Sequence, residues 1–300
     1  KVLSQGLYEE AFEHDACGVG YIAQIKGHKS HQIVSDSLTI LENMEHRGAC
    51  GCDPDSGDGA GILIQVPHQF LKEECNTLNI ILPEPGEYGV GMLFYPKKTT
   101  LKEACRTEIR KAAGKVGLQI LGFRKVPVNI TGIGETALSA EPDMEQVFVG
   151  KPLYVHTPED FERKLYVFKN LITKVINEVV KPIGQQFYVS SFSQNILVYK
   201  GQLTSGQVRH YFTDLSDKSL VSAFALVHSR FATNTFPSWK LAQPFRFIAH
   251  NGEINTLWGN RNAMTMRAPT DWRLNARARS SGSPRRSWRP RSPSRRRRRT

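Results

Sequence analysis

The chain has 300 residues, of which 40% are hydrophobic and 23% charged, so it can bury a substantial core in one large domain or two small ones. Its formal net charge of +12 would indicate a nucleic-acid partner, but twelve arginines lie within residues 273–300, which contain no acidic residue, and the remaining chain balances 28 basic against 28 acidic residues. No apolar run approaches the roughly 20 residues of a membrane span, and the odd number of scattered cysteines does not outline a disulfide framework.

The first distinctive stretch is Glu13–Ile22, which centres on Cys17. The cysteine is followed by Gly-Val-Gly and by a β-prone apolar run that predicts a strand over residues 19–25. The two glycines have no Cβ, so a ligand or another backbone segment can approach closely. This pattern is compatible with a nucleophile at the head of a strand and with a buried structural cysteine. Residues 1–16 are short and mixed in composition, which is typical of a disordered terminus.

Apolar spacing predicts helices over residues 33–44, 101–116, 159–180 and 255–266. Strands are predicted over residues 61–66, 89–95, 118–128, 146–149, 223–231 and 245–250. Residues 187–191 and 196–199 have the pattern of a hairpin followed by a turn at Gly201, and the polar residues 131–145 have that of a surface loop. Because strands and helices alternate only loosely, periodicity alone predicts a mixed α/β or α+β layered domain.

Residues 52–61 carry three aspartates and three glycines. A calcium loop beginning at Asp53 would need Glu at its twelfth position, where Ile64 stands, so a glycine-rich turn is the better prediction. Cys50 and Cys52 have the spacing of half a metal site, but no second pair or histidine set follows at zinc spacing. We therefore expect no metal centre.

Several later residues have side chains or backbone groups suited to binding a ligand. Arg230 ends an apolar strand, where a charge is either paired or directed at a ligand, and its planar fork matches a carboxylate. Asn251 and Gly252 follow another predicted strand, where Asn-Gly usually forms a hairpin turn, but helix-like sequence comes next and favours a strand-to-helix corner. Arg47 follows a predicted helix, where it can cap the helix dipole or take part in a site.

Five ordered stretches resemble the glutaminase domain of glutamate synthase, a class II (N-terminal-nucleophile) glutamine amidotransferase, over about residues 6–267. They are Glu13–Ile22, Glu45–Ala49, Asp55–Gly61, His228–Thr235 and His250–Asn255. The residues of these stretches, and the long segment between the third and the fourth stretch, fit glutamate synthase better than other amidotransferases of this class. The resemblance implies an α+β fold, a four-layer αββα sandwich of two antiparallel sheets, which we expect to be incomplete at the C-terminus.

The resemblance also implies how the nucleophile is prepared. Residues 1–16 would be a propeptide, and cleavage of the Ala16–Cys17 bond would free the α-amine of Cys17 at the start of an amidotransferase domain over residues 17–270. An α-amine has a pKa near 8, against ~10.4 for lysine, so a useful fraction is neutral and can act as general base for its own thiol.

The remaining roles come from the same resemblance. Asn251 and Gly252 would form the oxyanion hole, and together with Cys17 they are the expected catalytic residues. Arg230 and Thr233 would hold the α-carboxylate of the substrate, glutamine, and Arg47 would support the nucleophile. In complete glutamate synthases the ammonia passes to a synthase domain that uses FMN and an iron–sulfur cluster. We expect this chain to be an N-terminal fragment, from the cytoplasm or a plastid, that needs no cofactor and no membrane.

Residues 271–300 are rich in Arg, Ser and Pro and cannot bury enough apolar surface to fold. They fit an arginine–serine segment that binds RNA, or a truncated or mistranslated end of the gene. The family places an aspartate for the α-ammonium of glutamine further along, and no aspartate follows Asp271. Two alternatives to an active glutaminase therefore stay open: a catalytically dead fragment and an RNA-binding protein.

Overall fold

The computed structural model describes residues 18–48, 50, 53–180, 187–229, 237–246, 262 and 266. The chain divides into two units, residues 1–252 and 253–300, and the strands described all belong to the first. Of the second unit only Asn262 and Met266 are described, both with helical backbone, inside the helix predicted over residues 255–266. The predicted propeptide, the domain boundary at residue 270 and the arginine-rich tail lie outside the described residues.

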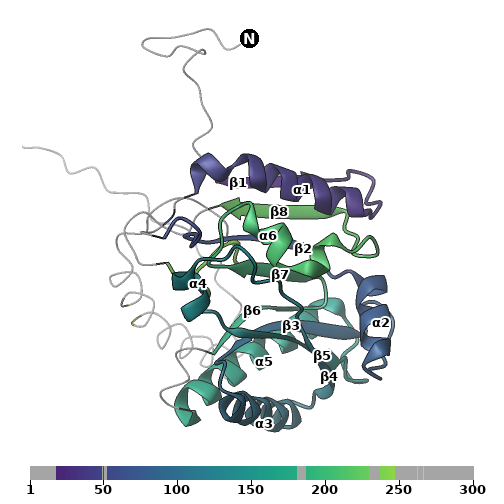
Figure 1. Cartoon of the computed structure of the whole chain (residues 1–300). Helices are drawn as coiled ribbons and strands as arrows, with labels where there is room; N and C mark the ends of the chain where they lie inside the picture. The colour runs from purple at the N-terminus through teal and green to yellow at the C-terminus, as the bar shows by residue number, and fades with distance from the viewer. Residues whose placement is uncertain are drawn as a thin grey trace, which may run out of the picture. The chain divides into compact units, whose positions relative to one another are not determined.

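The first sheet joins strands that are distant in sequence. β1 (Val19–Ala23), β8 (Phe224–Ser229), β2 (Ala60–Gln65) and β7 (Ile196–Gly201) lie side by side in that order, and each pair is antiparallel. Helix α1 (His31–Asn43) covers β1 and β8 with its apolar side (Figure 1). Ser30 caps this helix because its hydroxyl accepts a hydrogen bond from the Ile33 amide.

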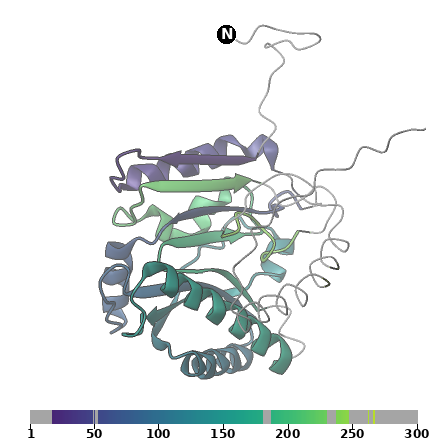
Figure 2. The same ribbon diagram turned by 180° about the vertical axis from the view of Figure 1, so that it is seen from behind.

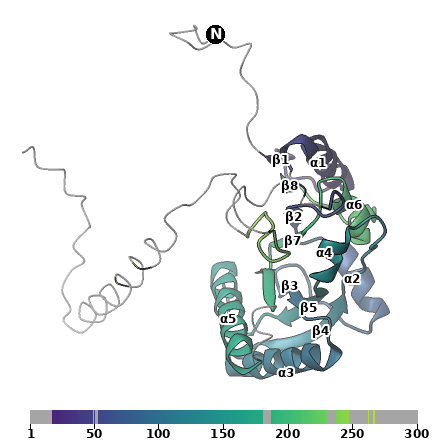
Figure 3. The same ribbon diagram turned by 60° about the vertical axis from the view of Figure 1, so that its left-hand side comes forward.

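The second sheet has the order β4 (Gln119–Lys125), β5 (Asp143–Gly150), β3 (Tyr88–Tyr95) and β6 (Tyr188–Ser193), again antiparallel. Helices α3 (Thr99–Lys115) and α5 (Pro158–Val179) cover it on the side away from α1 (Figures 2 and 3). Thr157 caps α5, and Pro158 supplies a φ suited to its first turn. The described residues thus form the predicted α+β fold, a four-layer αββα sandwich with two antiparallel sheets.

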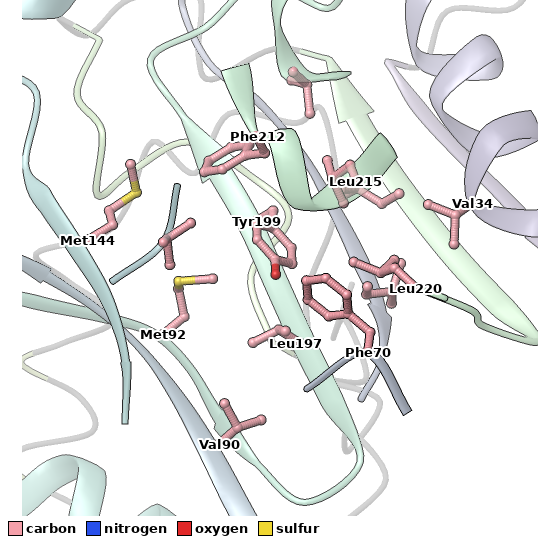
Figure 4. Close-up of a cluster of buried hydrophobic side chains, with 14 of the residues drawn as sticks. Val34, Phe70, Val90, Met92, Met144, Leu197, Tyr199, Phe212, Leu215 and Leu220 are labelled. Atoms are coloured by element: carbon pink, nitrogen blue, oxygen red, sulfur yellow. The ribbon is translucent and has the colours of Figure 1, made fainter. Parts of the chain in front are cut away.

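Two clusters of buried side chains hold these layers together. One joins α1, the first sheet and one face of the second sheet, and includes Leu197, Tyr199 and Met92. Figure 4 shows Tyr199 in the middle of this cluster, near Phe70 and beside Phe212, whose ring centre lies 5.2 Å from its own. The other cluster lies between the opposite face of the second sheet and α3 and α5. Both faces of the second sheet are therefore buried, which explains why all eight residues of β3 are buried.

The predicted hairpin over residues 187–191 and 196–199 is wrong. β6 pairs with β3 in the second sheet, whereas β7 pairs with β2 in the first. The chain crosses from one sheet to the other here, and the hydroxyls of Ser190 and Ser191 bond to the backbone of Val198. A period-two pattern predicts a strand but not its partner. Gly201, predicted as a turn, is the last residue of β7 and lies opposite Ala60.

The loop predicted over residues 131–145 is also wrong, because it contains α4 (Glu135–Ser139) and the first residues of β5. The sequence patterns do not predict α2 (His68–Thr77), α6 (Gln207–Tyr211) or the 3-10 turn Thr213–Ser216. Of the strand predicted over residues 245–250, Phe245 and Arg246 are described and are not in a strand. The other helices and strands predicted within the described ranges are confirmed, apart from their ends.

Candidate active site

The pairing of β1 with β8 brings the flanks of two candidate residues together. The amide of Ser229 donates a 2.7 Å hydrogen bond to the carbonyl of Gly18. Cys17 and Arg230 lie outside the described residues, but each is one peptide bond, about 3.8 Å between Cα atoms, from one of these partners. The described residues next to the candidate nucleophile and next to the candidate carboxylate-binding arginine, Gly18 and Ser229, are therefore adjacent.

Arg47 lies close to the same place. It ends the 3-10 turn Glu45–Arg47, which follows α1 and is closed by a 2.8 Å hydrogen bond from the Arg47 amide to the Met44 carbonyl. The Ser229 hydroxyl donates to the same carbonyl at 3.4 Å. A Cβ at Gly48 would lie 3.3 Å from the Ser229 Oγ, so the turn packs tightly against the end of β8.

The side chain of Arg47 also has an unused donor. Its Nε is buried and has no hydrogen-bond partner among the described residues. A buried donor without a partner loses its hydration and costs free energy. This is the condition expected of a guanidinium that completes its bonding with a substrate or with a catalytic group.

Two serines connect β8 to the neighbouring loop. The hydroxyls of Ser205 and Ser229 are 2.5 Å apart, and both are buried. They line a cavity of about 50 Å³ that also touches Gly48, Cys50 and Asp58. A cavity of this size holds a water molecule but not an amino acid. It is therefore a small internal space beside the Arg47 turn.

The described cysteines are poor nucleophiles. Burial raises the pKa of Cys75 to about 12 and that of Cys105 to about 11. The pKa of Cys50 is raised by partial burial and then by nearby carboxylates, among them those of Asp58 and Glu45. Because the thiolate is the reactive form, none of these three is activated.

The described residues offer no place for a cofactor built on cysteine. Cys75 and Cys105 are buried in different hydrophobic clusters, and Cys50 is exposed, so these thiols do not suit an iron–sulfur cluster. Within the described ranges no three His, Cys, Asp or Glu side chains gather as metal ligands. None of the helices described there is long and apolar enough to cross a bilayer.

Of the six candidate residues, the described ranges include Arg47, whereas Cys17, Arg230, Thr233, Asn251 and Gly252 lie outside them. The structure adds Ser205 and Ser229, which the sequence patterns did not single out. Ser229 lies within the stretch His228–Thr235, so its position next to Arg230 could have indicated that it lies near the site. Ser205 has no such signal, because it reaches the site through the connection from β7 to α6.

Comparison with known proteins shows the family to which the chain belongs. The family model for class II glutamine amidotransferases matches residues 17–276. A glutamate synthase [NADPH] large chain of Bacillus subtilis is 47% identical over 264 residues, which are 88% of this chain and 17% of that protein. A glutamate synthase [NADH] of Schizosaccharomyces pombe is 45% identical over 269 residues, 88% of this chain and 12% of that protein. A ferredoxin-dependent glutamate synthase of Arabidopsis thaliana is 41% identical over 255 residues, 85% of this chain and 16% of that protein.

The chain therefore belongs to the class II glutamine amidotransferases, and its αββα sandwich is the N-terminal-nucleophile hydrolase fold. These relatives are glutamate synthases, and the chain corresponds to their amidotransferase domain. It spans no more than 17% of their length.

Proposed function

We propose that this chain hydrolyses glutamine to glutamate and ammonia, with Cys17 as nucleophile, as the glutaminase part of a glutamate synthase. Family membership supports the reaction class. The observation that carries the assignment of residues is the hydrogen bond between Ser229 and Gly18, with the Arg47 turn packed against the same strand end. The contact between Gly18, Ser229 and the Arg47 turn supports a shared site for residues 17, 47 and 230.

In the proposed reaction, the α-amine of Cys17 takes the thiol proton, and Sγ attacks the side-chain amide carbon of glutamine. The tetrahedral intermediate collapses when the carbon–nitrogen bond breaks, and the α-ammonium returns the proton to the leaving amine as ammonia. Water then adds to the γ-glutamyl thioester, with the same amine as base, and releases glutamate and the free thiol. The balance is glutamine plus water to glutamate plus ammonia.

Binding residues act on two ends of the substrate. Asn251 and Gly252 donate hydrogen bonds to the oxyanion of the tetrahedral intermediate, where loss of one donor costs roughly 10²–10³ in rate. Arg230 and Thr233 bind the α-carboxylate, for which a bidentate guanidinium is well suited. Arg47 would support the nucleophile through its Nε, which has no hydrogen-bond partner among the described residues.

In the whole protein the ammonia would be consumed by a synthase domain, which would need FMN, an iron–sulfur cluster and a reductant. The names of the relatives specify NADPH, NADH or ferredoxin for different members. The described residues do not distinguish these donors, and we propose that the reductive chemistry takes place outside the amidotransferase domain.

The test is release of ammonia from glutamine by the purified chain, compared with the variants Cys17→Ala and Cys50→Ala. Loss of the nucleophile should lower kcat by at least about 10³-fold. Cys50 has a raised pKa and serves as the matched control, so Cys50→Ala should keep most of the activity. Inactive wild-type protein with residues 1–16 removed would favour the catalytically dead alternative, and equal loss in both variants would refute the assignment of Cys17.

A further inference from the structure

A cavity of about 340 Å³ lies between the ends of β3 and β7, which belong to different sheets. Its walls also include the end of α4, the turn over residues 140–142 and residues 237–240. Small-molecule sites begin at about 300 Å³, so this cavity suits a small ligand. It shares no described lining residue with the smaller cavity beside the Arg47 turn, so the two are separate spaces.

Two aromatic residues in the walls are held in place by contacts with the rest of the fold. The ring of Trp239 packs against Gly201, where a Cβ would come within 2.3 Å of it, and its Nε1 donates a 2.9 Å hydrogen bond to the carbonyl of Ala137 on α4. The ring centre of Phe94 lies 5.8 Å from that of Tyr188. Because these walls are already fixed, a ligand that enters the cavity has little ordering to cause.

Gln202, the residue after β7, is a buried polar residue in the wall of this cavity. It is 4% exposed, and its carboxamide has no hydrogen-bond partner among the described residues. A carboxamide both donates and accepts hydrogen bonds, and burying one without a partner costs about 1–3 kcal/mol. An apolar side chain would fill this place at no such cost, so the amide indicates a ligand that offers it a donor and an acceptor.

The lining also contains a pair of opposite charges, Lys97 and Glu141. The Lys97 Nζ lies 2.7 Å from a carboxylate oxygen of Glu141 and donates a 3.2 Å hydrogen bond to the Leu138 carbonyl. The other carboxylate oxygen accepts a hydrogen bond from the Tyr211 hydroxyl. The lysine side chain is 54% exposed, so the pair can be reached from solvent. A fixed ammonium beside a fixed carboxylate matches the two charges of a zwitterion.

We propose that this cavity is a second binding site, which takes a free α-amino acid whose side chain ends in an amide. The ligand's amide exchanges hydrogen bonds with Gln202, and its methylene groups lie against the ring of Trp239. Its α-carboxylate binds Lys97 and its α-ammonium binds Glu141. A metal ion fits less well, because the described lining offers a single carboxylate. The inference goes beyond the proposed reaction and does not depend on it, because every residue that it uses is described.

The test is equilibrium dialysis of the whole chain against L-glutamine, after the candidate active site has been blocked with a chloroketone analogue of glutamine. We expect one molecule of L-glutamine to bind per blocked chain. L-Norleucine has the same α-carbon groups and a side chain of similar length without the amide. It should bind about 10-fold or more weakly, because the Gln202 carboxamide then stays without a partner.

The variant Gln202→Met removes the carboxamide and keeps the length of the side chain. It should raise the Kd of L-glutamine about 10-fold and abolish the preference over L-norleucine. Its Tm should stay at the wild-type value or rise, because the free protein loses no bonded partner. A glutamine with a purely structural role would instead lower Tm when it is replaced.

A pair of neighbouring lysines tests the charged end of the site. Lys97→Met removes the partner of the α-carboxylate and should raise the Kd of L-glutamine about 10-fold. Lys98 is exposed and is not among the described residues that line the cavity, so Lys98→Met is the matched control. It removes the same charge one residue away and should leave the Kd near that of wild type.

Failure of the blocked chain to bind L-glutamine would overturn the proposal, because the cavity would then hold only water or belong to the candidate active site. Equal affinity for L-norleucine, or an unchanged Kd in Gln202→Met, would overturn it as well. If the chloroketone analogue does not react with the chain, the proposed function fails. The untreated chain then serves for the same titrations, and the Kd of Gln202→Met alone decides whether the cavity binds the amino acid.

Discussion

At the residue scale, the loop beside the candidate site depends on Gly57. A Cβ at this residue would lie 2.1 Å from the backbone carbonyl carbon of Leu203, and no side-chain movement can relieve a contact with backbone. Gly57 also bridges to Cys50, at the 50 Å³ cavity. The lack of a side chain at Gly57 therefore allows the connection after β7 to lie close to the Arg47 turn.

We expect Gly57→Ala to lower the free energy of unfolding by about 1–3 kcal/mol, since overpacking moves backbone. Gly114 is the control: it is exposed in α3 and its Cβ would meet nothing within 4 Å. Gly114→Ala should stabilise the chain by about 0.5–1 kcal/mol, because alanine loses less backbone entropy in a helix. Urea unfolding midpoints measure both, and a Gly57→Ala variant as stable as wild type would contradict the packing described.

Cys75 makes the stability of the fold depend on pH, and the sign of this dependence follows from the burial of its thiol. Its pKa is about 12 in the folded chain, against an ordinary value of 9.0, so the folded state keeps the proton longer than the unfolded state. The contribution of this protonated thiol to the free energy of unfolding is fully present below pH 9 and is lost as the pH rises towards 12.

Between pH 9 and 10.5 the loss from this one thiol should be about 1–2 kcal/mol. Urea unfolding of wild type and Cys75→Ala across this range measures it. The buried tyrosines contribute equally to both proteins, so the difference in slope isolates the cysteine. Parallel pH profiles would show that Cys75 does not titrate as its burial requires.

At the element scale, a buried polar network connects the two sheets at one end. Arg124 on β4 bonds to both carboxylate oxygens of Asp214 at 2.8 Å. The Tyr199 hydroxyl on β7 donates to Asp214 at 2.8 Å and accepts from Gln146 on β5 at 3.0 Å. Every member is hydrogen-bonded, so the network specifies how the sheets meet.

Removing one member should cost far more than removing the pair. Arg124→Met leaves the Asp214 carboxylate buried without its main counter-charge, and we expect a loss of about 3–5 kcal/mol in the free energy of unfolding. The double variant Arg124→Met/Asp214→Leu should recover much of this loss. Denaturant unfolding of the full double-mutant cycle measures the coupling, and additive effects would show that the two groups do not interact.

The sequence predicts local elements well where their signals are local. α5 has a capping threonine, a proline in its first turn and a long apolar stripe, and its prediction is confirmed. α2 begins after Pro67 with no side-chain cap, and α4 has only five residues, so neither carries a start signal or a full helical period. The pairing of β6 and β7 fails for a different reason, because strand partners depend on the whole sheet.

At the scale of the whole molecule, the site depends on contacts between distant parts of the chain. Gly18 meets Ser229 more than 200 residues later, and the Arg47 turn meets the same serine. Periodicity cannot predict such pairs, and only the resemblance of five ordered stretches indicated that these residues belong together. The contact of Ser205 with Ser229 comes from packing alone and carries no sequence signal.

We expect Cys17 to become the nucleophile once it is the first residue of the chain. The most direct measurement is peptide mapping after treatment with a glutamine analogue that carries a chloroketone in place of the side-chain amide. Trypsin cuts after Lys1 and Lys26, so an unprocessed chain gives a peptide of residues 2–26. We expect a peptide of residues 17–26 that is labelled on the Cys17 sulfur, and excess glutamine should prevent the labelling. Label on Cys50, or an unlabelled peptide of residues 2–26, would show that Cys17 is not the nucleophile.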